Sequence, residues 1–245
     1  DKKINGLIVP HAGYEYSGQV AAYGFRQLNN DYKTVILMAP SHHVRFDGAA
    51  VLNVSYFKTP LWKVKVSNKV EKLLKEDSVY EMPEVYEEEH SLEIQLPFLQ
   101  KTLKDFELVP LITGDVNPSE LAKVLEKYVD DKTLIIASSD LSHYHSYNEA
   151  VKLDNECIKN IEEMNIEGAS KCEACGVMPI LILMEIAKNF NWKSQIIKYA
   201  NSGDVTGDKS KVVGYSSIVF FEKEGSLSKE ERSILLKLAR EKLES

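Results

Sequence analysis

Side chains that can bind a metal follow several apolar segments of this chain, where a strand would run into the next element. His11 and His42 each follow such a segment closely, and Cys175 comes just before a predicted helix. In an α/β protein, the carboxyl ends of parallel strands converge on one crevice, where ligands usually bind. Imidazole and thiolate together suit a transition metal rather than magnesium or calcium. The sequence therefore predicts a metal site at this crevice.

Because two histidines follow strand ends, each is a stronger candidate for a metal ligand than it would be alone. A lone histidine at the position of His11 is more often a hydrogen-bonded loop residue, but His42 follows a second strand in the same way. His43, beside His42, offers either a partner that orients the ligand or an alternative ligand, and we favour the first role. A helix amino terminus behind Cys175 would favour the thiolate form that a metal requires.

Asp140 and His143 form a second group of reactive residues, after a predicted strand at residues 133–138. They are close enough in the chain for the carboxylate to orient the imidazole, as in a general base or a pair that supports a metal ligand. His90, just before a predicted helix, is on its own typical of a surface loop. A Gly-x-Ser-x-Gly motif and a glycine-rich phosphate loop are both missing from the sequence, which disfavours a serine hydrolase and a dinucleotide-binding protein.

Three cysteines, an odd and low number, fit a reducing cytoplasm better than a disulfide scaffold. Cys172 and Cys175 form a C-x-x-C motif, which invites a thioredoxin-like or a zinc interpretation. The chain has no second C-x-x-C to complete a four-cysteine zinc site, and no predicted strand precedes the pair as in thioredoxin. We therefore treat Cys172 as an ordinary helix residue, with a redox-active pair as the alternative.

Short apolar runs alternate with helical patterns, which is typical of a single α/β domain with a central, mostly parallel or mixed sheet flanked by helices. Several runs are apolar throughout, as strands buried on both faces are. The predicted strands are residues 7–10, 34–39, 49–54, 63–66, 108–113, 133–138, 195–199 and 214–221. The predicted helices are residues 17–28, 68–76, 92–103, 119–129, 148–164 and 179–189, with Ser17 able to cap the first and an Asn-Pro-Ser-Glu start signal at the fourth.

The composition is that of an ordinary soluble protein with an acidic balance. The 245 residues are 44% hydrophobic and 27% charged, and the formal net charge is −7. Because no basic stripe can neutralise phosphates, we expect no nucleic acid partner. No apolar run approaches the roughly 18 residues that cross a bilayer, so we expect no membrane partner either. The acidic residues 87–89 are predicted to form a solvated loop, with a charged mouth to a site as the alternative.

Several motifs stand in order between residues 5 and 221. They include VPHAGYEYSG at 9–18, APSHH at 39–43, YFKTPL at 56–61, EHSLEIQLP at 89–97, SSDLSH at 138–143 and CG at 175–176. Together they resemble the Memo family, whose members are related in fold to class III extradiol ring-cleaving dioxygenases. The resemblance implies that His11, His42 and Cys175 are metal ligands, with the cysteine where the ring-cleaving relatives place a carboxylate.

The same resemblance implies a cofactor and further site residues. Iron(II) is the implied metal, and copper is its competitor because a thiolate makes the site softer. His143 would carry a proton as acid or base with Asp140 beside it, His90 would be another pocket histidine, and Tyr16 would help to wall the pocket.

The function that the resemblance implies is a metal-dependent, dioxygenase-like oxidoreductase acting on a small, unknown substrate. Replacing a carboxylate with a thiolate puts the ring-cleaving reaction itself in question. The alternative is a binding or scaffold protein that uses the same pocket to recognise a peptide or phosphopeptide.

The domain is expected to span residues 1–222, followed by a charged linker and an amphipathic helix at 223–245. That tail resembles the opening helix of an AMMECR-type domain, which in microbes can be fused to Memo-like domains. The resemblance implies a second domain of that kind, fused to this one or acting as its partner.

Overall fold

The computed structural model describes residues 2–29 and 31–222, and every structural statement below concerns these residues. The predicted linker and helix at 223–245 therefore lie outside the described part of the chain. Within it, no helix combines the length and the apolar composition that crossing a bilayer requires.

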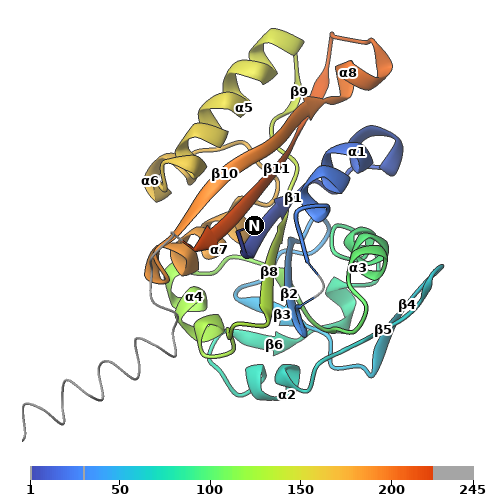
Figure 1. Ribbon diagram of the computed structural model, residues 1–245, viewed down its shortest axis with the longest axis vertical. Helices are drawn as coiled ribbons and strands as arrows, with labels where there is room; N and C mark the ends of the chain where they lie inside the picture. The colour runs from blue at the N-terminus through green and yellow to red at the C-terminus, as the bar shows by residue number, and fades with distance from the viewer. Residues whose placement is uncertain (1, 30, 223–245) are drawn as a thin grey trace, which may run out of the picture.

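The centre of the fold is a large mixed sheet with four adjacent parallel strands (Figure 1). Its order is β10-β11-β1-β8-β2-β7-β3-β6, and β9 pairs with β11. The strands β1, β8, β2 and β7 run parallel, whereas β11 and β3 are antiparallel to their neighbours β1 and β7. The α/β class and the mixed sheet agree with the sequence prediction.

The strands of this sheet include all but one of the predicted strands, and a separate two-stranded hairpin holds the remaining one. The sheet strands are β1 Ile4–Val9, β2 Thr34–Pro40, β3 Ala49–Val51, β6 Val79–Glu81, β7 Glu107–Thr113, β8 Thr133–Ser138, β9 His143–His145, β10 Trp192–Asn201 and β11 Val212–Glu222. The hairpin strands are β4 Tyr56–Thr59 and β5 Trp62–Lys65. Sequence analysis missed β4, β6 and β9, which are three or four residues long and too short for a clear period.

Helices cover both faces of the sheet. They are α1 Tyr14–Phe25, α2 Lys69–Leu73, α3 Leu96–Thr102, α4 Pro118–Glu126, α5 Tyr147–Glu162, α6 Ile166–Ala169, α7 Val177–Asn189 and α8 Ser202–Thr206, with 3-10 turns η1 Pro83–Val85 and η2 Glu93–Gln95. The helices α6 and α8 and the 3-10 turn η1 were not predicted, whereas η2 lies within the helix predicted at residues 92–103. The predicted Asn117 start signal is confirmed, because its side chain accepts hydrogen bonds from the backbone of Ser119 and Glu120.

Alternate residues of the central strands face two separate cores. Ile8 and Ile36 pack with side chains of α4, α5 and α7 on one face. Leu7 and Val35 pack with side chains of α1 and α3 on the other face. Burial on both faces explains why these strands are apolar throughout, and it fixes which end of each strand reaches solvent.

The first helix begins earlier than predicted. Helix α1 starts at Tyr14, and the backbone N–H of Ser17 already donates to the carbonyl oxygen of Gly13. The Ser17 hydroxyl donates to the carbonyl oxygen of Ala12, at 2.9 Å. The predicted cap at Ser17 is therefore wrong. Its side chain instead ties the first helical turn to the loop that carries His11.

The three cysteines behave differently from the prediction. A disulfide joins Cys157 of α5 to Cys172, which lies in the loop between α6 and α7. The expectation that the cysteines form no disulfide is thus wrong, as is the placement of Cys172 in a helix. Because Cys172 is paired with Cys157, the alternative of a Cys172–Cys175 redox pair is also contradicted, and Cys175 is the free thiol.

Removing the disulfide should lower the stability of the protein. Its two cysteines are 15 residues apart, and a crosslink that closes a loop of this length contributes about 3 kcal/mol in the chain-entropy account. We expect Cys157→Ser to lower the free energy of unfolding by roughly that amount in urea titrations. The matched control is Cys157→Ser with Cys172→Ser, which should show the same loss in the presence and absence of reductant. A wild type that loses no stability on reduction would contradict the prediction.

Candidate metal centre

The parallel register of three neighbouring strands brings the predicted residues together. Val9 of β1 lies beside Ser138 of β8, and Met38 of β2 lies beside Ala137. The residues that follow these strands therefore leave the sheet at one edge. His11 and His42 lie there, with ring centroids 5.2 Å apart and nearly perpendicular.

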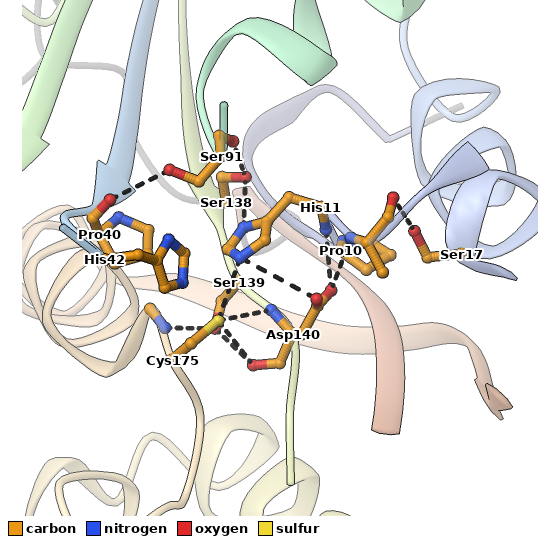
Figure 2. A network of polar contacts seen from close by, with 12 residues as sticks. Pro10, His11, Ser17, Pro40, His42, Ser91, Ser138, Ser139, Asp140 and Cys175 are labelled. Carbon is orange, nitrogen blue, oxygen red and sulfur yellow. Dashed lines mark hydrogen bonds and ion pairs between the residues drawn. The ribbon is translucent and has the colours of Figure 1, made fainter. Parts of the chain in front are cut away.

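Hydrogen bonds around Ser138 fix the proton of the His11 ring. The Ser138 hydroxyl donates its single hydrogen to the carbonyl oxygen of Ser91, at 2.6 Å. Its oxygen must therefore accept the remaining bonds, one from the side-chain amide of Gln95 and one from Nδ1 of His11 at 3.0 Å. Nδ1 of His11 thus carries a proton, and Nε2 is the ring nitrogen that is left to face the site. Figure 2 shows this ring directed toward the sulfur of Cys175.

His42 is held by a buried carboxylate. Nδ1 of His42 lies 3.1 Å from both oxygens of Glu89, and its backbone N–H donates to Oε2 of Glu89 at 2.6 Å. The backbone of Ser91 donates to the other oxygen, at 2.9 Å. The Glu89 side chain is fully buried, and although burial alone would raise its pKa, these hydrogen bonds hold the pKa well below its usual range. The ionised carboxylate keeps a proton on Nδ1 and leaves Nε2 of His42 for the site.

Cys175 approaches the two histidines from the loop before α7. Its sulfur lies 3.2 Å from Nε2 of His11 and accepts a hydrogen bond from the backbone N–H of Asp140, at 3.3 Å. Burial raises the pKa of the Cys175 thiol, but hydrogen bonds with His11 and His42 outweigh it and lower the pKa to about 7. The hydrogen bonds with Cys175 and Glu89 raise the pKa of His42 to about 10.

Gly176 allows this approach. A Cβ atom at position 176 would lie 2.4 Å from the carbonyl oxygen of Ser138 and 2.6 Å from Cβ of Ser139. The backbone N–H of Gly176 also donates to the Ser139 hydroxyl, at 2.9 Å. Only a residue without a side chain brings the loop this close to the end of β8, which explains the glycine directly after the candidate ligand.

The donor atoms fit a transition metal. The ligand atoms of His11, His42 and Cys175 all lie within 4.8 Å of one another. Nε2 of His11 and the Cys175 sulfur lie 3.2 Å apart, so a proton or a metal ion can be shared between them. Two imidazoles and one thiolate suit iron, copper or zinc rather than magnesium or calcium. His42 is 36% exposed, which leaves one side of the site open.

Asp140 and His143 form a second group around the same sulfur. Their ligand atoms and the sulfur of Cys175 lie within 4.8 Å of one another. The predicted orienting contact takes a different form, since Oδ1 of Asp140 accepts from the backbone N–H groups of His11 and Ala12, at 2.8 and 3.3 Å. Asp140 therefore fixes the loop that carries His11, and burial raises its pKa to about 6.

The remaining predicted residues lie at the edge of the site. His43 is exposed, with its ring centroid 6.5 Å from that of His42, and Glu89 rather than His43 bonds Nδ1 of His42. His90 is exposed and belongs to neither group of candidate ligands. Tyr16 is partly exposed on α1, and it interacts electrostatically with the buried Tyr215.

Sequence reasoning missed the residues that orient the ligands. Glu89 was assigned to a solvated acidic loop, but its side chain is buried, and only Glu87 and Glu88 are exposed as predicted. Gln95 was assigned to a helix without a role, although it donates to Ser138 and to the carbonyl oxygen of Pro10. The signal for both was their place in the motif at residues 89–97, where a carboxylate and an amide sit amid apolar residues.

Comparison with known proteins identifies the family of this chain. The family model described as Memo-like protein matches residues 1–219. The chain belongs to the Memo family. A MEMO1 family protein of Sulfurisphaera tokodaii is 35% identical over 238 residues, covering 89% of this chain and 84% of the relative. One of Saccharolobus solfataricus is 36% identical over 241 residues with the same coverage, and one of Sulfolobus acidocaldarius is 35% identical over 232 residues, covering 87% and 81%.

The buried carboxylate of this Memo protein supplies a test of the candidate metal centre. Glu89→Gln keeps the shape of the side chain but removes the charge that holds the proton on Nδ1 of His42. Because residues that orient a metal ligand typically contribute 10- to 100-fold to metal affinity, we expect Glu89→Gln to weaken binding of iron(II) or copper(I) by about that factor. Competition against a chelating dye measures it.

The matched control is Glu88→Gln, which removes the same charge from the exposed neighbouring residue. It should bind metal as the wild type does. Equal affinities for the two variants, with both folded by circular dichroism, would mean that Glu89 does not orient His42 for a metal.

Proposed function

We propose that this Memo protein is a metal-dependent, dioxygenase-like oxidoreductase that acts on a small molecule. His11, His42 and Cys175 would hold iron(II) or copper. The proposal rests on the distances between their three donor atoms, which all lie within 4.8 Å of one another. Both histidines have Nδ1 engaged by a fixed partner, so both can offer Nε2 without rearrangement. When bound, the metal supplies Lewis acidity and one-electron redox chemistry.

His143 and Asp140 are the groups that would hold or move a proton. The ligand atoms of these two residues and the Cys175 sulfur all lie within 4.8 Å of one another. Burial raises the pKa of Asp140 to about 6, so near neutral pH a fraction of this carboxyl group still carries a proton. His143 is half-buried at the start of β9. An imidazole at this position can accept a proton from a substrate hydroxyl and return it later in the reaction.

A cavity beside Cys175 offers room for a small substrate. It measures about 650 Å³ and is lined by Cys175 together with residues of the loops after β2 and β7. This volume lies within the range of small-molecule sites. Arg45 contributes a guanidinium group to the lining, Asp47 and Asp115 contribute carboxylates, and Met178 contributes an apolar surface. The cavity therefore suits a compact substrate.

Metal content tests the proposed ligands. The protein purified from cells, or reconstituted anaerobically with iron(II) or copper(I), should hold close to one metal ion per chain by elemental mass spectrometry. The His11→Ala, Cys175→Ala double variant should hold less than about a tenth of that, because two of the three donors are gone. The control is His145→Ala, which removes a histidine that belongs to neither group of candidate ligands. A wild type that holds no metal after reconstitution with either ion would overturn the proposal.

His143→Ala separates metal binding from turnover. We expect this variant to keep its metal and to lose oxygen consumption by about 100-fold or more with any substrate found in a screen of small aromatic acids, since general acid–base catalysis contributes 100- to 10,000-fold. Retained turnover would remove His143 from the reaction. If no screened substrate reacts and peptide binding at this pocket survives metal removal, the peptide-binding alternative gains support.

A further inference from the structure

The β4–β5 hairpin projects from the body of the protein (Figure 1). It carries a large exposed aromatic side chain. Trp62, at the start of β5, is 74% exposed, and Leu61 beside it in the turn is 44% exposed. An indole that packs against its own protein is mostly buried. The tip of the hairpin therefore presents apolar surface to solvent.

The backbone at Trp62 adopts a conformation that favours glycine. Its φ is 137°, in a region that residues with a Cβ atom rarely enter. Three hydrogen bonds maintain this conformation. The side-chain amide of Gln100 donates to the carbonyl oxygen of Trp62 at 3.2 Å. The single hydroxyl hydrogen of Thr59 is shared between two acceptors, the carbonyl oxygen of Trp62 at 2.9 Å and Oε1 of Gln100 at 2.6 Å. The tip is thus held rigidly against α3.

A strained residue needs a compensating interaction. At Trp62 the usual compensation, burial of the side chain in the core, is largely missing because most of the indole is in solvent. Glycine would occupy the same conformation without strain. We take the tryptophan as evidence that its side chain contacts something outside this chain.

The surface next to Trp62 is basic. A groove of about 460 Å³ lies between the hairpin and α3, and it is lined by Leu61, Trp62, Lys63, Val64, Lys65, Gln100, Lys101, Leu103, Lys104, Asp105 and Phe106. Asp105, its one carboxylate, already pairs with Lys33 at 2.9 Å. Lys101 and Lys104 are exposed, and within the described part of the chain neither has an ion pair. This groove, the Trp62 groove, is therefore positive on a chain whose net charge is −7.

We propose that the Trp62 groove binds an acidic peptide segment of a partner protein. An apolar side chain of the segment packs on Trp62, and its carboxylates face Lys101 and Lys104. A nucleic acid strand or an anionic membrane is disfavoured because either extends far beyond the groove and would meet the negative remainder of the surface. The groove shares no lining residue with the metal centre, so the proposal does not depend on the metal.

Trp62→Gly tests the strain and the binding together. If the tryptophan serves an external partner, replacing it with glycine removes strain and raises the melting temperature by roughly 2 to 4 °C, the shift that relief of about 1 kcal/mol gives in a protein of this size. The control Tyr80→Ala removes another exposed aromatic residue from a strand and should give no such rise. A lower melting temperature for Trp62→Gly would mean that the indole stabilises its own chain, which overturns the proposal.

Binding is measured by fluorescence anisotropy with a short labelled peptide of glutamate and aspartate residues around a central Leu-Phe pair. The wild type should bind it at low salt and release it as ionic strength rises. Trp62→Gly should weaken binding by about 30-fold, the typical cost of removing a tryptophan at the centre of an interface. Lys101→Glu with Lys104→Glu should weaken it by at least 10-fold. The control Lys72→Glu with Lys75→Glu, at the end of α2 and just after it, should change it less than 2-fold.

Two results would contradict the proposal. One is equal anisotropy titrations for the wild type and for the Lys101→Glu, Lys104→Glu variant. The other is tighter binding to oligothymidylate, or to vesicles containing phosphatidylserine, than to the acidic peptide, which would assign the groove to a different class of partner. The protein is used without added metal, so failure of the proposed oxidoreductase activity leaves these measurements unaffected.

Discussion

The parallel register of β1, β8 and β2 is the constraint on which the rest of this structure depends. Because the three strands end at one edge of the sheet, the residues after them must meet, although His11 and Asp140 are 129 positions apart in the chain. The two apolar cores make this register rigid, since a shift by one residue would turn each strand's buried side chains toward the wrong layer of helices. The position of His11 relative to His42 is thus set by hydrophobic packing rather than by the ligands themselves.

Hydrogen bonds to the two histidine rings determine which nitrogen of each ring faces the site. The Ser138 hydroxyl donates its one hydrogen to the carbonyl oxygen of Ser91, so it can only accept a hydrogen bond from His11. This places a proton on Nδ1 of His11. Glu89 does the same for His42 by charge. Burying this carboxylate is costly unless its oxygens are fully bonded. The backbone N–H groups of His42 and Ser91 meet that requirement, which is why the loop at residues 89–91 packs against the end of β2.

The sequence predicted the class of fold and the three convergent donors because both depend on local patterns. Apolar runs mark buried strands, and a histidine after such a run must lie at the sheet edge. It did not predict what holds the donors in place. Glu89 stands beside two exposed glutamates in the chain, and only the tertiary fold distinguishes the buried one. The Cys157–Cys172 pairing depends on how α5 packs against the loop before α7, and the sequence offered only Cys175, as an alternative, for the partner of Cys172.

Two features of the chain contradict local preference, and they do so for different reasons. Gly176 is a glycine because a Cβ atom would collide with the end of β8, so the demands of the site determine the residue. Trp62 is the reverse case, a bulky residue where the backbone favours glycine, with its side chain in solvent. Local and global preferences normally agree in a folded chain, and exceptions gather where function is selected. The first exception lies at the metal centre. The second lies on a surface without any candidate ligand, which is why we assign it to a separate binding function.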